Sequence, residues 1–219
     1  MSTPHEENYL KSIYKLVEKS PTASGLAANT SIANDLGINP ASVSDMLKRL
    51  HDKGYIVYQK QKGASLTATG KKVAVKIIRK HRLWEVFLVE KMSFAWDEVH
   101  EVAEQLEHIQ SEQLIERLDK LLGHSKTCPH GDPIPDSKGN IMKPKTILLS
   151  ETLEGKNYAV KSFKDTSAEF LRYLDRVKLK VGSKISVVEV EEYDGTRVIE
   201  VGKDRIAVSK KVAEVIFVV

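Results

Sequence analysis

Apolar and polar positions in the first seventy residues form three helical segments separated by polar turns. Apolar residues recur at helical spacing from about His5 to Val17, and the polar run that begins at Pro21 predicts the end of this helix. A short helix from Ser31 to Leu36 stops at Gly37, and the next helix begins at Pro40, a residue that suits a first helical turn. Two short helices joined by so tight a turn predict a helix-turn-helix.

An alternating pattern replaces the helical one further along the chain. The stretch Val57–Leu66 predicts a hairpin with its turn around Gln61–Ala64 and with Lys60 and Lys62 at the tip. A hairpin after a helix-turn-helix is the wing of a winged helix, so we predict a DNA-binding domain over residues 1–72. A helical hairpin in a protein that does not bind DNA is the alternative. The predicted DNA contacts are Asn39, Pro40, Ala41, Ser42, Ser44, Asp45, Lys48, Lys60 and Lys62.

Helical spacing returns in residues 73–124. Three helices are predicted, over Lys71–Lys91, His100–His108 and Ser111–Leu122, and the last ends at Gly123. Their apolar faces are broad and have no predicted sheet to cover them. We therefore predict a dimerisation domain, which suits a protein that reads a palindromic, two-fold DNA operator.

The last third of the chain changes from helices to strands. Prolines and glycines fill residues 125–145, and we interpret this segment as a linker, including its two metal-type side chains Cys128 and His130. Short strands and one capped helix follow in residues 146–219 and predict a small SH3-like β-barrel. The predicted fold class is mainly α with a small β domain.

Composition narrows the class of protein. The chain has 219 residues and one cysteine, which excludes an internal disulfide and fits a reducing compartment. No apolar run is long enough to span a membrane, so we expect a cytoplasmic protein. Residues 1–75 hold ten basic and six acidic residues, an excess that equals the net charge of +4 of the whole chain. A basic first domain on a neutral remainder is typical of a DNA-binding regulator.

Metal-type side chains gather in the middle of the chain. His81 and Glu85 are four residues apart, and a second set falls at helical spacing on one predicted face. Mixed imidazole and carboxylate donors suit metals such as Mn, Fe, Co, Ni and Zn. Histidine and glutamate on a solvated helix surface are the alternative. The second set is His100, Glu104, Glu107 and His108.

These motifs in this order resemble the diphtheria toxin repressor family of metal-dependent transcriptional regulators over nearly the whole chain. The resemblance rests on the winged helix, on the segments 79–85, 99–108 and 131–135, and on the β domain. It implies a homodimer that binds Fe(II) or Mn(II) as corepressor, at up to two sites per chain, and represses metal-uptake genes.

The resemblance also implies a role for individual residues. His81, Glu85 and His100 match an ancillary metal site, to which Glu169 and Asp165 of the β domain would add ligands. A primary site would take Glu104, Glu107, His108 and Asn8. The chain departs from the manganese-sensing branch of the family at Asn8 and Lys11, where that branch has carboxylates. Glu104 in place of a thiolate favours Mn(II) over Fe(II) narrowly.

A shared ion would act by joining the first helix to the dimerisation domain. A metal that favours one hinge angle would set the distance between the two recognition helices of a dimer. Two other classes stay open: an enzyme of the metallohydrolase or di-iron type that uses the same His/Glu set, and a metal-independent winged-helix regulator or adaptor.

Overall fold

The structure is a computed structural model, and it describes residues 2–19, 25–142 and 144–219. The described residues form two compact units. The first unit comprises the described residues of Met1–His81, Gln105–Ser111 and Pro135–Asn140, and the second comprises those of Arg82–Glu104, Glu112–Ile134 and Ile141–Val219. Helix α4 (Ala68–Met92) contributes to both.

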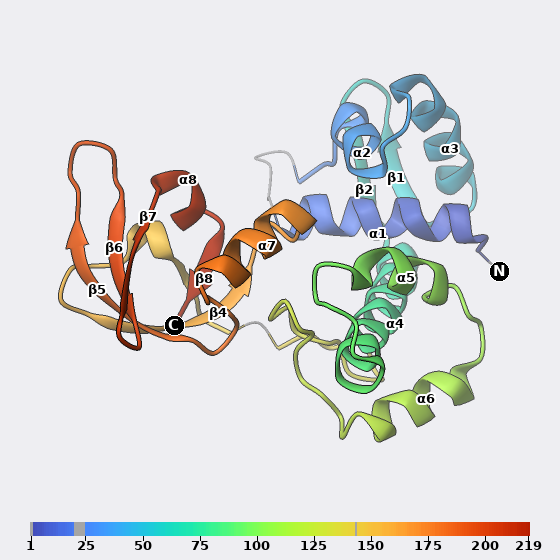
Figure 1. The fold of residues 1–219 in the computed structure, drawn as a ribbon. Helices are drawn as coiled ribbons and strands as arrows, with labels where there is room; N and C mark the ends of the chain where they lie inside the picture. The colour runs from blue at the N-terminus through green and yellow to red at the C-terminus, as the bar shows by residue number, and fades with distance from the viewer. Residues whose placement is uncertain (1, 20–24, 143) are drawn as a thin grey trace. The chain divides into compact units, whose positions relative to one another are not determined.

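The first unit is a winged helix. Helix α1 (Pro4–Lys19) packs on α2 (Asn29–Leu36), and α2 packs on α3 (Pro40–Asp52), as the blue helices of Figure 1 show. The hairpin of β1 (Ile56–Gln59) and β2 (Gly63–Leu66) follows. The core is made of the buried side chains Leu10, Ile13, Ile32, Leu47 and Leu50.

Local chemistry explains the turn between α2 and α3. Gly37 ends α2 in the left-handed conformation with a φ of 64°, which glycine adopts without steric cost. The Asn39 side chain accepts a hydrogen bond from the N–H of Ala41 and caps α3, whose first residue is Pro40. The predicted winged helix-turn-helix is confirmed. The predicted break at Pro21 lies outside the described residues.

The helical part of the second unit differs from the prediction at one helix end. Helix α5 (Val99–Leu106) stops two residues short of His108, so Glu107 and His108 lie in a turn rather than on the helix face that we predicted. The N–H of Ile109 bonds to the carbonyl of Leu106 and closes this turn. Helix α6 (Glu112–Leu121) then runs as predicted. None of the helices in the described ranges has the length and apolarity that a membrane span needs.

The β domain is a six-stranded antiparallel sheet in the order β3-β8-β4-β5-β6-β7. Its core contains Leu149, Val160, Phe163, Leu171 and Ile199. Figure 1 shows β5 and β6 as a long hairpin in orange. The elements are β3 (Ile147–Leu148), the 3₁₀ helix η1 (Leu149–Glu151), β4 (Asn157–Phe163), α7 (Ala168–Arg176), β5 (Lys184–Val190), β6 (Arg197–Val201), β7 (Asp204–Val208), α8 (Lys210–Ala213) and β8 (Ile216–Val218).

The segment between α6 and β3 holds neither a helix nor a named strand in its described residues. It is nevertheless folded, because Thr127 and Pro133 form an isolated bridge and the N–H of Cys128 bonds to the carbonyl of Asp132. The N–H of Phe163 on β4 also donates to the carbonyl of His130. This loop therefore has a defined backbone path against the β domain.

Candidate metal centre and DNA interface

A buried ion pair lies inside the first unit, between α1 and the turn after α5. The ammonium of Lys11 donates to both carboxylate oxygens of Glu107, at 2.7 and 2.9 Å. The Nδ1 atom of His81 lies 2.6 Å from the second of these oxygens. Burial alone would raise the pKa of Glu107, but the hydrogen bond from His81 and the charge of Lys11 outweigh it and lower that pKa. Glu107 is therefore a carboxylate, and His81 Nδ1 is a donor.

A second ion pair joins the same two segments. The carboxylate of Glu7 on α1 lies 2.7 Å from Nδ1 of His108, and Nε2 of His108 lies 3.8 Å from Glu107. We name Lys11, Glu107, His81, Glu7 and His108 the Glu107 cluster. It contains the predicted ligands Glu107 and His108, but the α1 residues that reach them are Glu7 and Lys11.

The Glu107 cluster does not fit a divalent cation as it is built. Both oxygens of its central carboxylate already accept hydrogen bonds from an ammonium, and the Lys11 side chain is 6% exposed. A metal ion at Glu107 would lie beside this positive charge, which is buried away from bulk solvent and is therefore weakly screened. Of the other predicted members of the primary site, Asn8 is half-buried on α1 and Glu104 is exposed on α5.

Helix α1 also holds the recognition helix. The carboxylate of Glu6 is buried and lies 2.7 Å from Lys53 and 3.6 Å from Arg49 at the end of α3. Burial would raise the pKa of Glu6, but the hydrogen bond from Lys53 and the nearby charges lower it. Adjacent residues of α1 thus hold the end of α3 and the turn at His108.

A different group of donors lies in the second unit. Glu85, Cys128 and His130 are all buried, and each offers a ligand atom within 4.8 Å of the other two. The Glu85 oxygen that faces His130 at 3.5 Å also lies 2.8 Å from Nδ1 of His100. The rings of His100 and His130 stack with their centroids 4.6 Å apart. We name Glu85, His100, Cys128 and His130 the Glu85 cluster.

The tautomer of His130 is set by its surroundings. Its Nε2 atom lies 2.8 Å from the carbonyl of Trp96, and a carbonyl only accepts, so Nε2 carries the proton. Nδ1 faces the carboxylate of Glu85 and the sulfur of Cys128, and it can donate to Glu85 when it carries a proton. Loss of that proton would free its lone pair for a metal ion. A hydrogen bond from the ring nitrogen that does not bind the ion, here Nε2, is the arrangement that orients metal-ligating histidines in proteins. Although burial lowers the pKa of His130, the hydrogen bond with Glu85 outweighs it and raises that pKa.

The chemistry of the Glu85 cluster fits a divalent transition metal. Carboxylate, imidazole and thiolate are the donors that such ions take, and the cluster offers all three types. Burial and the carboxylates of Glu85 and Asp132 raise the pKa of the Cys128 thiol, so the sulfur is protonated in the absence of an ion. Metal binding would therefore release a proton from Cys128.

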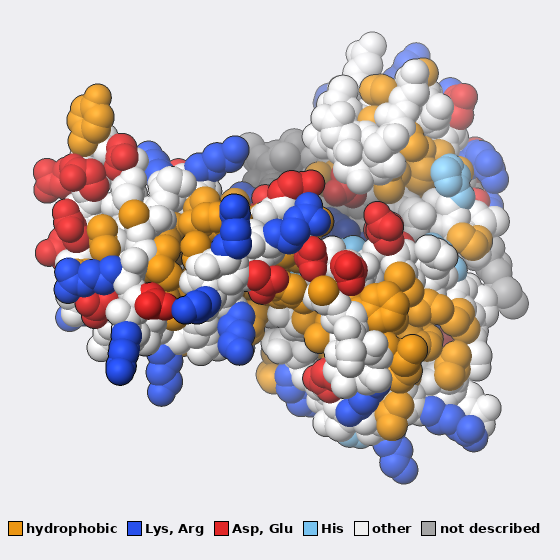
Figure 2. All heavy atoms as spheres, viewed as in Figure 1, with side chains coloured by type: hydrophobic (Ala, Val, Ile, Leu, Met, Phe, Trp, Pro, Cys, Tyr) orange, Lys and Arg blue, Asp and Glu red, His pale blue; other side chains and the backbone are white. Residues whose placement is uncertain are grey.

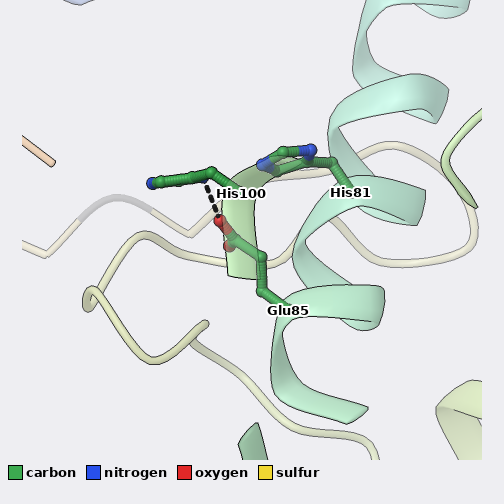
Figure 3. Close-up of side chains that lie close together, drawn as sticks. All are labelled: His81, Glu85 and His100. Carbon is green, nitrogen blue, oxygen red and sulfur yellow. Dashed lines mark ion pairs between the residues drawn. The ribbon is translucent and has the colours of Figure 1, made fainter. Parts of the chain in front are cut away.

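The residues predicted for the ancillary metal site come from α4 and α5. His81 precedes Glu85 by one turn of α4, and the ligand atoms of His81, Glu85 and His100 lie within 4.8 Å of one another (Figure 3). Of the β-domain ligands expected with them, Glu169 is exposed and lies 3.7 Å from Arg172. Asp165 accepts a hydrogen bond from the N–H of Ser167. Neither belongs to a donor group among the described residues.

Sequence reasoning missed Cys128 and His130, which we interpreted as linker. The only local sign is the glycine that follows them. Gly131 has a φ of 85°, and a Cβ at this position would collide with the carbonyl of Lys161 on β4. A larger residue would move the loop away from the β domain, and with it the two donors.

The predicted DNA contacts are exposed residues of the first unit, except for Ser44. Asn39, Pro40, Ala41 and Ser42 at the start of α3 are exposed, as are Asp45 and Lys48 one and two turns later. Ser44 is half-buried and accepts a hydrogen bond from Asn29. Lys60 and Lys62 are exposed at the tip of the hairpin. An exposed helix start is what docking in a major groove requires, and exposed wing lysines suit phosphate contacts, so these DNA contacts stay a prediction.

Comparisons with known proteins agree with this architecture. The family model described as the N-terminal DNA binding domain of iron dependent repressors matches residues 1–64, and that described as their metal binding and dimerisation domain matches residues 67–136. The HTH-type transcriptional regulator MntR of Bacillus subtilis (strain 168) is 33% identical over 122 residues, which are 56% of this chain and 82% of that protein. The chain belongs to the diphtheria toxin repressor family. The resemblance predicted from its sequence is confirmed.

Other relatives include regulators named for iron and regulators named for manganese. The iron-dependent repressor IdeR of Mycobacterium tuberculosis (strain ATCC 25618 / H37Rv) is 36% identical over 129 residues, 59% of this chain and 54% of IdeR, so the chain spans about half of that relative's length. A solved manganese-dependent transcriptional repressor in complex with manganese has a TM-score of 0.89 and 29% identity over 98% of this chain and 99% of the other. The manganese regulator SloR has a TM-score of 0.80 and 34% identity, covering 100% and 99%. Residues 147–219 match the FeoA domain.

Proposed function

We propose that this diphtheria toxin repressor family member is a DNA-binding transcriptional repressor that uses Mn(II) or Fe(II) as corepressor to control metal-uptake genes. The observation that carries the proposal is the buried carboxylate, imidazole and thiol of the Glu85 cluster in a chain that also presents an exposed recognition helix. The metal-dependent repressors IdeR and MntR support it.

Each member of the Glu85 cluster would have a distinct task. Glu85 supplies negative charge, and His130 presents Nδ1 because the Trp96 carbonyl holds the other nitrogen. Cys128 supplies a soft donor after it loses its proton. When bound, the ion supplies a positive charge that draws these side chains together. A soft thiolate beside imidazole and carboxylate favours Fe(II). The sequence, in contrast, narrowly favoured Mn(II).

The proposal includes a homodimer. Helix α6 keeps Ile115 and Leu118 buried but leaves Leu114 and Leu121 exposed, at 39% and 60%. Hydrophobic side chains gather over the region of α4, α5 and α6 in Figure 2. Apolar surface of this kind suits a two-fold interface, and a dimer would present two recognition helices to a palindromic operator.

Fluorescence anisotropy with a labelled palindromic duplex tests the function. The duplex would be drawn from the promoter of a metal-uptake gene of the same genome, and binding would be measured in EDTA, Mn(II) and Fe(II) under anaerobic, reducing conditions. We expect at least 100-fold tighter binding with Mn(II) or Fe(II). Equally tight, sequence-specific binding in EDTA would contradict the metal requirement, and no binding in any condition would contradict the DNA-binding function.

A control variant separates DNA contacts from metal contacts, and a turnover assay tests the enzyme alternative. Lys60→Ala should weaken binding to every duplex and reduce the slope of log K against log salt by about 0.9, because one phosphate contact is lost. Its response to metal should be unchanged. A turnover assay with ester and phosphoester substrates covers the hydrolase alternative, which needs an open ligand position. The burial of Glu85, Cys128 and His130 favours a regulatory site instead.

A further inference from the structure

We propose that Lys11 is a built-in cation that replaces a metal ion in the Glu107 cluster, so that α1 is held to the turn after α5 whether or not metal is present. On this proposal each chain binds one divalent ion, at the Glu85 cluster. The ion count rests on the proposed function, whereas the role of Lys11 does not.

The position of the ammonium is the first argument. Lys11 Nζ lies within 2.9 Å of both oxygens of Glu107, the geometry of a cation bound symmetrically by a carboxylate. Both side chains are buried, at 6% and 0% exposure. Moving the ammonium of Lys11 away would leave the buried carboxylate of Glu107 without this counter-charge. The ammonium would then need water or another acid as its partner.

The charges around Glu107 are the second argument. His81 donates to one of its oxygens, and His108 contacts the other at 3.8 Å while pairing with Glu7. Lys80 lies at the same turn, with its ammonium 3.0 Å from the carbonyl of Ile109. Two lysines therefore have their ammonium groups at this turn. A divalent ion would add two further positive charges to this set.

The acids of α1 are the third argument. Glu6 pairs with Lys53 and Arg49 of the recognition helix, and Glu7 pairs with His108. The next residue is Asn8, whose side chain carries no negative charge. The helix thus supplies a positive group to Glu107, and its Glu7 carboxylate is paired with His108.

Metal counting tests the stoichiometry. Purified, reduced chain would be titrated anaerobically with Mn(II) by calorimetry, and bound ions would be counted by mass spectrometry after desalting. We expect one ion per chain for the wild type and for Glu107→Gln, none for Cys128→Ser, and two for the double variant Asn8→Asp/Lys11→Glu. Two ions in the wild type, with one lost in Glu107→Gln, would overturn the proposal.

A thermal double-mutant cycle tests the lysine independently of metal binding. In EDTA, Lys11→Met and Glu107→Gln should each lower Tm by about 10 °C, and the double variant should fall little further, because each change removes the same buried pair. Saturating Mn(II) should leave this coupling intact. Additive shifts, or coupling that disappears with Mn(II), would overturn the role of Lys11.

Two further variants keep the cycle interpretable. Lys11→Arg retains a cation and should recover most of the Tm that Lys11→Met loses, which separates loss of charge from a failure to fold. Lys72→Met removes an exposed lysine of α4 and should change Tm by less than about 2 °C. If the wild type binds no ion at all, the proposed function and the ion count both fail, and the EDTA cycle still decides whether Lys11 holds Glu107.

Discussion

The Glu107 and Glu85 clusters are both built around a buried glutamate with two histidines, but they differ in the residue that completes them. In the Glu107 cluster a lysine of the chain neutralises the central carboxylate. In the Glu85 cluster the carboxylate faces two imidazoles and a protonated thiol, all of which can become metal ligands. Histidine and glutamate content alone therefore does not distinguish an ion pair from a metal site. The deciding feature is whether the chain supplies its own cation.

The largest expected effect comes from removing the central acid of the Glu107 cluster. Glu107→Ala leaves the ammonium of Lys11 buried without its carboxylate, and should lower the free energy of unfolding by about 3–5 kcal/mol. Urea denaturation in EDTA and in Mn(II) measures it, and the loss should be the same in both. Glu101→Ala, an exposed position on α5, is the control and should change little. A loss seen only with Mn(II) would mean that Glu107 is a ligand.

The corresponding change in the Glu85 cluster should affect metal affinity instead. Cys128→Ser removes the thiolate donor and should weaken Mn(II) or Fe(II) binding by more than about 100-fold, with little change in stability in EDTA. Calorimetric titration measures the affinity. Glu169→Gln serves as the comparison, because this side chain is exposed and pairs with Arg172, and its affinity should match the wild type. Equal losses in both variants would indicate that the ion also binds Glu169.

Glu6, the buried acid that holds the end of α3, extends the comparison to the pH dependence of stability. The pKa of Glu6 is lowered in the folded state from its ordinary 4.5, so its ion pairs stabilise the fold above about pH 4.5, and this stabilisation is lost as the pH falls through the lowered pKa. Glu6→Gln should cost roughly 1.5–3 kcal/mol at pH 7, and the difference from wild type should shrink toward zero in acid. Denaturation between pH 3 and 7 checks this, and Glu98→Gln, on an exposed residue, should run parallel to the wild type. A gap that stays constant with pH would assign the loss to packing.

The smallest expected effect concerns the support of His130. Trp96 stacks on His130 at 5.9 Å, and its indole N–H donates to Asp175 of α7. Trp96→Phe keeps the ring and the backbone carbonyl but removes this hydrogen bond, so metal affinity should fall by at most about 10-fold. Fluorescence of the wild type should change on metal addition, and that change should vanish in the variant. Trp84→Phe is the control and should retain it.

Most of the fold could be predicted from local patterns. Helical spacing, the Gly37 stop and the Asn39-Pro40 start predicted the helix-turn-helix, because these signals act within a few residues. The predicted end of α5 was wrong by two residues, because the helix ends at Leu106 and not at His108. Glu107 and His108 continue the helical spacing in sequence, but their side chains are held by Lys11 and Glu7, some hundred residues earlier in the chain.

The site was predicted less completely, for the same physical reason. His81, Glu85 and His100 lie on helices whose spacing is visible in the sequence. Cys128 and His130 lie in a loop without periodicity, and only the contact of Gly131 with β4 and the bonds of the loop backbone bring them to Glu85. Lys11 was noticed as a departure from a family pattern, but its bond with Glu107 depends on the tertiary structure.

The adjacent acids at the start of α1 limit how this segment can change in length. Successive residues of a helix point about 100° apart, so Glu6 and Glu7 face different neighbours, and Lys11 is aligned with Glu7 one turn on. A single inserted residue between Glu7 and Lys11 would turn the ammonium by more than a quarter of a circle away from Glu107. The segment between Glu7 and Lys11 should therefore tolerate substitution far better than insertion or deletion.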